Sequence, residues 1–363
     1  MKYEKIFSSL ILFFLKIFLS LKESNSLDLG NPKKILIIRQ HNQLGDMFAG
    51  VSLFKAVKQK YPEANVTLIA SPQNFAAVQN KFILKLFVFD KSKLFQFNYL
   101  KKLYQILRTD YDVVIVPVTV SISLTSNLLA RFSKSKIRIG PASLDGKVND
   151  SAFLFDRRIN LDWRKYHDCH IAERILDIVR PFGIATEDFR SELTLDRNDE
   201  LIANNFISKI KPTNGELLIG LHVGAGKPQN KWALINYVTL IGLLQKKYKV
   251  KFYLTGTDTD RDEINFILAN SPIKILTFLN QRITAVASLI SKSNLFISND
   301  TGVMHAAGTT ETPQISIFGP TNPLNWAPIG INKFFLRKSE LIDDVHPTDV
   351  FQLCKSILDN QKK

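Results

Sequence analysis

Residues 294–308 read NLFISNDTGVMHAAG, and this stretch decides the expected fold. The apolar run 295–298 is typical of a buried strand. The NDTG sequence at 299–302 then offers side chains that cap helices and a glycine that lets another group approach the backbone. Small residues follow at helix spacing, and a second apolar run at 314–318 ends in GPT at 319–321. This order of strand, helix N-terminus, helix and strand predicts an open α/β sheet.

The start of the helix at 299–302 has two interpretations. In α/β sheets, a helix that begins at the carboxyl end of a parallel strand is where phosphate binds, because free N–H groups and the helix dipole favour an anion there. The stretch would then be a phosphate and sugar site. Alternatively, it is a plain strand, turn and helix in which Asp300 or Thr301 is an ordinary N-cap. The choice between a phosphate site and an ordinary N-cap depends on the other motifs of the chain.

The size and charge of the chain narrow the classes of protein to which it can belong. Its 363 residues suit two domains, and Cys169 and Cys354 have neither metal-ligand spacing nor the number for a disulfide framework. The formal net charge of +15 indicates an anionic partner: nucleic acid, an anionic membrane surface or a phosphorylated substrate. The sequence contains no zinc-finger spacing or RNA-binding aromatic motif, so we expect no nucleic-acid partner.

Residues 1–32 form an apolar extension ahead of the first domain. Residues 6–21 read IFSSLILFFLKIFLSL, which is shorter than the roughly 20 apolar residues that span a bilayer. Three interpretations remain: a helix lying in the membrane interface with its lysines toward anionic headgroups, a helix packed on the protein itself, and a signal peptide. We expect the first, with contact to the membrane surface through residues 1–30.

The first domain is expected at 33–185 and begins with a βαβ unit. The run KILIIR at 34–39 predicts a parallel strand buried on both faces, and a helix with apolar residues on one face follows as far as Tyr61. Between them lies QHNQLGD at 40–46, whose single glycine excludes a GxGxxG dinucleotide fingerprint. Gly45 is therefore expected to form a tight turn.

Two side chains of this loop are candidates for chemistry. Asp46 is either a carboxylate favoured by the helix dipole in the first turn or a catalytic base that faces a cleft. His41 is either an ordinary loop residue or a base or acceptor ligand. The residue types alone do not choose between these interpretations.

The alternation of strands and helices continues to the polar region 186–213, which we expect to link the two domains. One helix is predicted over 166–181, where His170 and Glu173 share a face but are too few for a metal site. Another is predicted over 94–107, where aromatic residues and lysines are interleaved, as on a solvated basic face or a membrane-facing patch.

The second domain is expected at 214–330, followed by a tail with a final helix at 331–363. Its short apolar runs predict a second doubly wound sheet, with the candidate loops at the carboxyl ends of the strands. Asp258 comes shortly after the apolar run 250–254. An acidic residue just past a strand end can hold ribose hydroxyls.

The loop after the first strand of this domain reads GAGKPQNKW at 224–232. It is not a P-loop, because the GxxxxGK[ST] spacing is absent and proline follows the first lysine. Exposed backbone N–H groups at Gly224 and Gly226, together with Lys227 and Lys231, are expected to make an anion site. The alternative is a basic surface loop, but two glycines beside lysines after a buried strand favour function.

Taken together, these residues resemble glycosyltransferase family 9, the heptosyltransferase-like enzymes of bacterial surface polysaccharide synthesis. The resemblance spans about residues 33–330, and its last group is the specific one. The matching pieces are ILIIR at 35–39 with LGD at 44–46, GAG at 224–226 with KW at 231–232, LTG at 254–256, and finally DTG at 300–302 with His305, FGPT at 318–321, Trp326 and Pro328.

The resemblance implies an α/β chain of the GT-B fold, in which two Rossmann-like, doubly wound domains face a cleft. It also implies an enzyme that uses no metal or other cofactor and inverts the configuration at the anomeric carbon. Asp46 would be the general base that deprotonates the acceptor hydroxyl, with His41 and Gly45 on the acceptor side.

The resemblance also implies a binding site for a nucleotide-sugar donor. The glycine–lysine loop would neutralise the diphosphate, Asp258 would hold the ribose, and the DTG sequence would hold phosphates and sugar. The family lysine usually lies two residues before the tryptophan, where this chain has Asn230, so Lys227 or Lys231 would take over its role. The implied donor-binding residues are Gly224, Gly226, Lys227, Lys231, Asp258, Asp300, Thr301, Gly302 and His305.

The expected function is transfer of a heptose-like sugar from a nucleotide-diphosphate donor, with ADP-heptose as the first candidate. The expected acceptor is the lipopolysaccharide core or a related anionic, lipid-linked envelope glycan. A nucleotide-using enzyme needs the cytosol, so we expect a cytoplasmic protein, peripheral on the inner face of the cytoplasmic membrane. Two other functions stay open: a nucleotide-sugar epimerase of the same architecture, and a non-catalytic nucleotide-sugar-binding or glycan-binding protein, which Asn230 favours.

Overall fold

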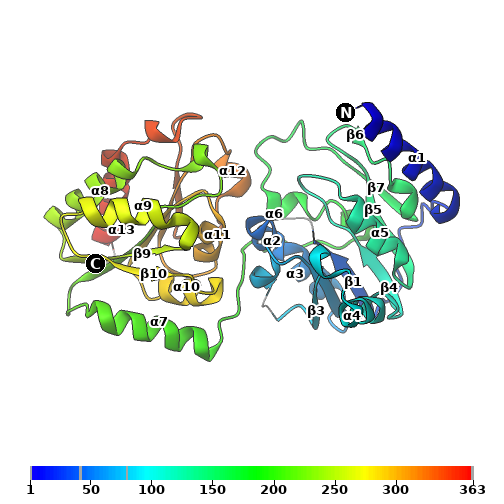
Figure 1. Cartoon of the computed structure of the whole chain (residues 1–363), viewed down its shortest axis with the longest axis horizontal. Helices are drawn as coiled ribbons and strands as arrows, with labels where there is room; N and C mark the ends of the chain where they lie inside the picture. Colours follow the sequence, from blue (N-terminus) through cyan, green and yellow to red (C-terminus); the bar gives the residue numbers. More distant parts are fainter. Residues whose placement is uncertain (1, 41–42, 79–80, 361–363) are drawn as a thin grey trace. The chain divides into compact units, whose positions relative to one another are not determined.

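The computed structural model describes residues 2–40, 43–78 and 81–360. The chain divides into two compact units, residues 1–189 and 190–363. Each unit is an α/β structure built on one mainly parallel sheet with helices packed against it (Figure 1). The division between the units falls near the start of the region 186–213 that the sequence predicts as a linker.

The sheet of the first unit has the strand order β3-β2-β1-β4-β5-β6, with β7 also paired to β5. Its central strands are buried apolar runs, as expected for a parallel sheet covered on both faces. Among the described strand pairs of this unit, β5 with β6 is the one antiparallel pair. The strands are β1 (Lys34–Ile38), β2 (Asn65–Ala70), β3 (Lys85–Val88), β4 (Tyr111–Ile115), β5 (Ser135–Leu144), β6 (Lys147–Val148) and β7 (Arg157–Leu161).

Two helices follow β1 where the sequence predicts one. Helix α2 (Leu44–Ala49) ends at Gly50, and helix α3 (Val51–Lys60) begins directly after it. A Cβ atom at Gly50 would lie 2.1 Å from the Arg39 Nη1 atom. The glycine is therefore needed because the buried guanidinium of Arg39 lies against this helix junction.

The helix predicted over 166–181 is wrong for most of that range. Helix α6 spans only Ile171–Arg174, and a 3₁₀ turn covers Arg180–Phe182. His170 caps the start of α6, because its Nδ1 atom accepts a hydrogen bond from the Ala172 backbone N–H at 3.1 Å. The other helices of this unit are α4 (Phe97–Leu107) and α5 (Leu124–Phe132).

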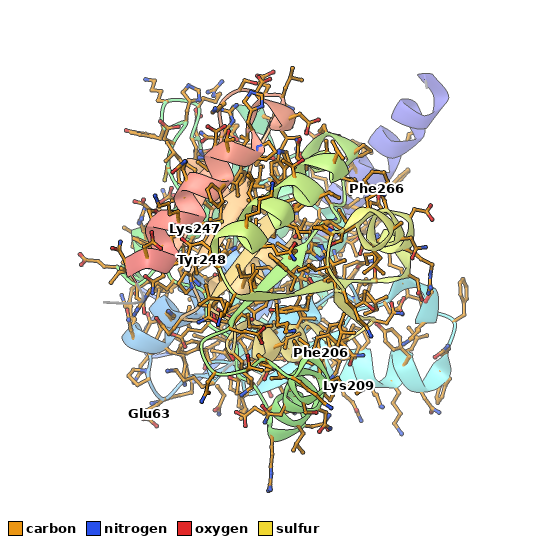
Figure 2. The ribbon with its side chains drawn as sticks, turned by 90° about the vertical axis from the view of Figure 1, so that its left-hand side faces the viewer. Glu63, Phe206, Lys209, Lys247, Tyr248 and Phe266 are labelled. Carbon is orange, nitrogen blue, oxygen red and sulfur yellow. The ribbon has the colours of Figure 1, made fainter. Side chains whose placement is uncertain are left out.

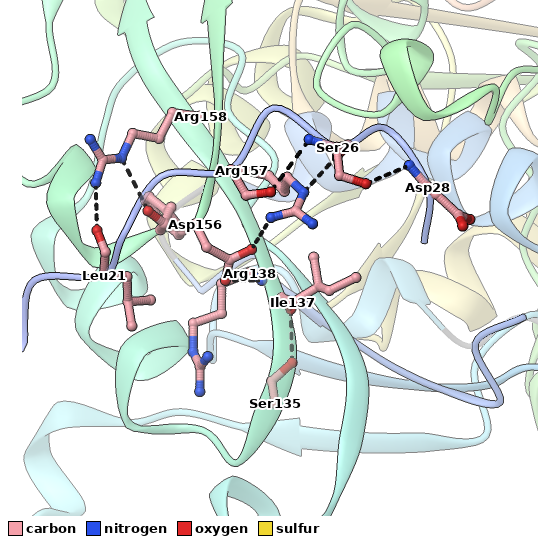
Figure 3. A network of polar contacts seen from close by, with 11 residues as sticks. Leu21, Ser26, Asp28, Ser135, Ile137, Arg138, Asp156, Arg157 and Arg158 are labelled. Atoms are coloured by element: carbon pink, nitrogen blue, oxygen red, sulfur yellow. Dashed lines mark hydrogen bonds and ion pairs between the residues drawn. The ribbon is translucent and has the colours of Figure 1, made fainter. Parts of the chain in front are cut away.

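The apolar N-terminal run lies in helix α1 (Lys2–Leu19). None of the described helices is long and apolar enough to cross a membrane. The chain after α1 is fixed to the first unit, since the Leu21 N–H donates to the Phe153 carbonyl at 2.9 Å. Figure 3 shows this segment beside β5 and β7, where Arg157 Nε donates to the Ser26 carbonyl at 2.7 Å.

The sheet of the second unit is parallel throughout its described pairs and has the order β10-β9-β8-β11-β12-β13. The strand order reverses between β8 and β11, so this unit is doubly wound. The strands are β8 (Leu217–His222), β9 (Val250–Gly256), β10 (Leu276–Leu279), β11 (Leu295–Asn299), β12 (Gln314–Ile317) and β13 (Lys333–Leu336).

Helix α7 (Arg197–Ile210) lies inside the region predicted as a linker and packs on the second unit. Its Phe206 ring is 6.2 Å from the Tyr253 ring and 4.8 Å from the Phe278 ring, measured between centroids. Figure 2 labels Phe206 and Lys209 on this helix; Phe206 is buried and Lys209 is exposed. The predicted linker therefore contributes to the core of this unit.

The region predicted as a tail also joins the second unit. Strand β13 pairs with β12, and helix α13 (Pro347–Asn360) packs on helix α8 (Leu234–Lys247) with Cys354 fully buried in the core. Burial raises the pKa of the Cys354 thiol, so this side chain acts as a core residue. The remaining helices are α9 (Arg261–Asn270), α10 (Ile283–Ile290), α11 (Gly302–Gly308) and α12 (Pro323–Trp326).

Candidate functional site

The candidate donor residues of the second unit lie on loops that leave the carboxyl ends of its strands. Strands β8 and β11 are neighbours, paired from Ile219 with Leu295 to His222 with Ser298. The loop after β8 and the start of α11 after β11 therefore lie at the same edge of the sheet, at its topological switch point. This is the place where doubly wound sheets bind ligands.

Asn299, the last residue of β11, holds the loop after β8 in place. Its buried amide Nδ2 donates to the carbonyl oxygens of Val223 at 3.0 Å and Gly224 at 3.2 Å. Its Oδ1 accepts hydrogen bonds from the Trp232 backbone N–H at 3.3 Å and the Tyr237 hydroxyl at 2.9 Å. One side chain thus fixes both ends of the glycine–lysine loop. The sequence reasoning did not find this role, although a polar residue ending a buried strand was a signal.

Asp300 lies beside the position where the family lysine is expected. Its Oδ2 accepts a hydrogen bond from Asn230 Nδ2 at 2.9 Å, and Asn230 is itself buried. Burial raises the pKa of Asp300, while a hydrogen bond from Thr321 and the charge of Lys227 oppose that rise. Asn230 therefore binds the carboxylate that follows β11.

The next two residues of the DTG sequence start helix α11. Thr301 is its N-cap, and the Thr301 hydroxyl accepts a hydrogen bond from the Met304 N–H at 3.3 Å. Gly302 is the first helical residue and is half-buried. His305 is buried one turn further on, with its ring 6.3 Å from the Trp326 ring in an edge-on contact. The N-cap interpretation of Thr301 is thus confirmed, and it is compatible with anion binding by the N–H groups at this helix start.

The two candidate lysines, Lys227 and Lys231, have different surroundings in the structure. Lys231 forms an ion pair with Glu263 of α9, and the same contact lowers the pKa of Glu263. Lys227 is exposed on the loop, where its charge acts on Asp300. The two lysines therefore differ in how much of their charge remains for a ligand.

The glycines of this loop have different surroundings. A Cβ at Gly224 would lie 2.1 Å from the Asp260 Oδ1 atom, so a side chain there would force Asp260 away. Gly226 is exposed and has open space around its Cα. The first glycine thus permits close packing of the loop against Asp260, and the second leaves the backbone accessible.

Asp258 follows β9 and is exposed. Its backbone N–H donates to the Asn280 side chain at 3.0 Å, and its carboxylate forms an ion pair with Arg261. The contacts with Asn280 and Arg261 lower the pKa of Asp258. A carboxylate at this strand end has the charge and exposure needed to accept hydroxyl hydrogen bonds.

Asp46 of the first unit lies in the first turn of α2 and is buried. Its Oδ2 accepts a hydrogen bond from the Gln43 N–H at 3.0 Å, and its carbonyl oxygen accepts one from Arg39 Nη2 at 2.9 Å. Burial lowers the pKa of Arg39 to about 10, against the opposing charge of Asp46. Gly45 lies inside α2, so the tight turn predicted for it is wrong. His41 lies outside the described residues.

The described residues contain no group of three or more His, Cys, Asp or Glu side chains that could hold a metal ion.

Comparison with known proteins places the chain in a family. A family model described as glycosyltransferase family 9 (heptosyltransferase) matches residues 100–353, which is more than half of the chain. The chain therefore belongs to glycosyltransferase family 9, and it is a glycosyltransferase.

Individual relatives agree with this assignment. Lipopolysaccharide heptosyltransferase 3 of Escherichia coli (strain K12) is 24% identical over 304 residues, which cover 78% of this chain and 82% of that protein. The crystal structure of a family 9 glycosyltransferase from Veillonella parvula DSM 2008 matches with a TM-score of 0.76 at 16% identity, over 94% of this chain and 99% of that one. The structure of E. coli ADP-heptose lipopolysaccharide heptosyltransferase II gives a TM-score of 0.73 at 18% identity, over 91% and 100%. The predicted GT-B fold is confirmed.

Proposed function

We propose that this chain transfers a heptose-like sugar from a nucleotide-diphosphate donor of the ADP-heptose kind to the lipopolysaccharide core or a related envelope glycan. The observation that carries the proposal is the joint arrangement of the loop after β8 and the start of α11, which Asn299 holds together. Further support comes from the family, whose described activity is heptosyl transfer, and from the names of the relatives.

The donor diphosphate is proposed to bind between the loop after β8 and the N-terminus of α11. Charge develops on this diphosphate as the bond to the sugar breaks, and backbone N–H groups and cations stabilise it. Lys227 is the better candidate for this role, because Lys231 is paired with Glu263. Asp258 would accept hydrogen bonds from the ribose, and Asp300 with Thr301 and Gly302 would contact the phosphates and the sugar.

The chemical step is proposed to be a single displacement with inversion and without a metal ion. Asp46 takes the proton of the acceptor hydroxyl while the oxygen attacks the anomeric carbon, and the diphosphate leaves with the bonding electron pair. Arg39 supports the backbone of the helix turn that carries Asp46, through its hydrogen bond to the Asp46 carbonyl. His41 and Gly45 would flank the acceptor.

The protein is proposed to act at the inner face of the cytoplasmic membrane, attached peripherally through its N-terminal residues 1–30. The support is the apolar surface of α1, where Phe13, Phe14, Ile17 and Phe18 are all more than half exposed. A helix with exposed aromatic side chains and lysines suits the interface of an anionic membrane.

The proposal is tested by calorimetric titration of the full chain with ADP-, UDP-, GDP- and TDP-linked sugars. We expect selective binding of one donor, with an ADP-linked heptose first. Lack of binding to every donor would contradict the proposal and favour the non-catalytic glycan-binding protein. Asn230, bonded to Asp300 in the place of the family lysine, is the observation that supports that second function.

A further inference from the structure

A basic cavity of about 450 Å³ lies in the first unit between α4, α5 and the start of β5. It is separate from the residues proposed for catalysis and donor binding. Every charged residue among its described lining is a cation, and these are Arg108, Arg131, Lys134 and Arg138. The cavity therefore has the charge of a site for an anion.

The cations of this cavity are only partly neutralised. Arg138 is buried and donates to the carbonyl oxygens of Ala130 at 3.0 Å and Ser133 at 2.6 Å. Burial and the nearby charge of Arg131 both lower the pKa of Arg138, and Asp156 opposes them. An anion bound between these guanidinium groups would relieve their mutual repulsion.

The other two cations have weaker partners. Lys134 pairs with Asp110 at 2.6 Å, but both side chains are mostly exposed, so water screens the pair. Arg108 lies over the ring of Tyr104, with its Cζ 5.5 Å from the ring centroid. Both cations can therefore turn toward a ligand at the mouth of the cavity.

Exposed aromatic side chains line the cavity, and others lie near the start of α4. Tyr104 and Phe132 line it and are 61% and 51% exposed. Phe97, on the first turn of α4, is 80% exposed, and Phe95 just before it is 99% exposed. Exposed aromatic residues beside cations favour the boundary between lipid headgroups and acyl chains over open water.

The C-terminal end of helix α1 is hydrogen-bonded to a residue of the cavity lining. Arg131 lines the cavity and also donates from its Nε atom to the carbonyl of Leu19, the last residue of α1, at 2.7 Å. The exposed apolar residues of α1 are therefore tied to the same part of the unit as the cavity. Figure 3 shows Arg138 next to the segment that follows α1.

We propose that this cavity binds the phosphate of an anionic phospholipid headgroup while α1 and the exposed aromatic residues of α4 and α5 enter the membrane interface. The proposal extends the peripheral attachment under the proposed function by adding a defined headgroup site. It does not depend on catalysis. A lipid is favoured over free phosphate because the cations are bordered by exposed apolar side chains, which a soluble ion would leave uncovered.

The test is sedimentation of the full chain with phosphatidylcholine vesicles that contain or lack phosphatidylglycerol, at constant ionic strength. The variant Arg108→Gln/Arg131→Gln removes two cavity cations. The matched control is Lys246→Gln/Lys247→Gln, two exposed lysines of α8 in the second unit, of which Figure 2 labels Lys247. Because a basic residue near an anionic surface contributes roughly fivefold in affinity, we expect the cavity variant to bind phosphatidylglycerol vesicles roughly 30-fold more weakly. The control should change less than about twofold.

Two further measurements keep the outcome clear. Arg108 is exposed at the end of α4, so Arg108→Gln alone should fold normally and bind roughly fivefold more weakly. Titration of the cavity variant with the donor should give the parent affinity, which separates this proposal from the proposed function.

Equal losses of vesicle binding in the cavity and control variants would show diffuse charge attraction and overturn the proposal. Binding of inorganic phosphate at the cavity without any vesicle difference would overturn it too.

Discussion

The strand-to-helix junctions after the first strand of each sheet share a topology but carry different chemistry. Strand β1 ends at Ile38 and α2 begins at Leu44. The Asp46 carboxylate accepts a hydrogen bond from the Gln43 N–H at 3.0 Å, so it is fixed in the first helical turn. After β8 the chain makes a longer loop before α8, and Asn299 of β11 holds that loop from outside. The first junction offers a negative group, and the second offers N–H groups and Lys227. Sheet topology thus gives the place of a site, while the loop sets its charge.

This comparison predicts a division of roles between the two junctions. Changes at the first should affect transfer and leave donor binding intact, whereas changes at the second should affect donor binding.

The largest expected effect is that of Asp46→Asn. Loss of a general base lowers turnover by roughly a thousandfold, while the donor affinity stays at the parent value.

Steady-state turnover and donor calorimetry on the same preparation measure both quantities. Asp150→Asn, an exposed change in the same unit, is the control and should keep full activity. Full activity in Asp46→Asn would remove Asp46 as the base.

The next largest effect concerns the residue that shapes the second junction. Asn299→Ala removes four buried hydrogen bonds, to Val223, Gly224, Trp232 and Tyr237. We expect the free energy of unfolding to fall by about 3 kcal/mol, together with a loss of donor binding. Chemical denaturation measures the first and calorimetry the second. The exposed Asn205→Ala should change neither, and parent-like donor affinity in Asn299→Ala would refute the shaping role.

A smaller effect separates the two lysines of the loop. Lys227→Ala should weaken donor binding by about tenfold, because an exposed charge near Asp300 is lost from the proposed diphosphate site. Lys231→Ala should weaken it by less than about threefold, because that lysine is already paired with Glu263. Calorimetric titration with the same donor compares them. A larger loss of donor affinity in Lys231→Ala than in Lys227→Ala would show that Lys231 binds the diphosphate.

The smallest effect is a pH dependence at Asp300. Burial raises the pKa of this carboxyl in the folded state above 3.8, so ionisation as pH rises favours the unfolded state. In the ligand-free protein, Asp300→Asn should therefore increase the free energy of unfolding at pH 7. The gain should vanish below about pH 4, where Asp300 is protonated in both states. Thermal unfolding across this pH range measures it, and a gain that is independent of pH would exclude ionisation as the cause.

The strands and the fold could be predicted from the sequence because buried parallel strands are continuous apolar runs. The stretches 34–39, 217–223 and 295–298 were found in this way, and each contains or matches a strand of the structure. The helix predicted over 166–181 begins only at Ile171, because His170 caps it there, and this side-chain contact is not visible in apolar spacing.

The candidate site could be predicted only in part. The DTG sequence and the glycine–lysine loop were found from residue type and position. The contacts that set their roles join residues far apart in the chain, such as Lys231 with Glu263 and Asn230 with Asp300. A pattern of neighbouring residues does not contain such pairings. The roles assigned to Asp46 and to the donor-binding residues stay predictions.

The central claim is that the junction after β1 serves transfer and the junction after β8 binds the donor. Its most direct test is a titration of ADP-heptose into three proteins: the parent chain, Asp46→Asn and Lys227→Ala. The account predicts equal donor affinity for the parent and Asp46→Asn, and an affinity about tenfold weaker for Lys227→Ala. Weaker binding by Asp46→Asn with no change in Lys227→Ala would contradict it, because the donor would then depend on the first junction and not on the second.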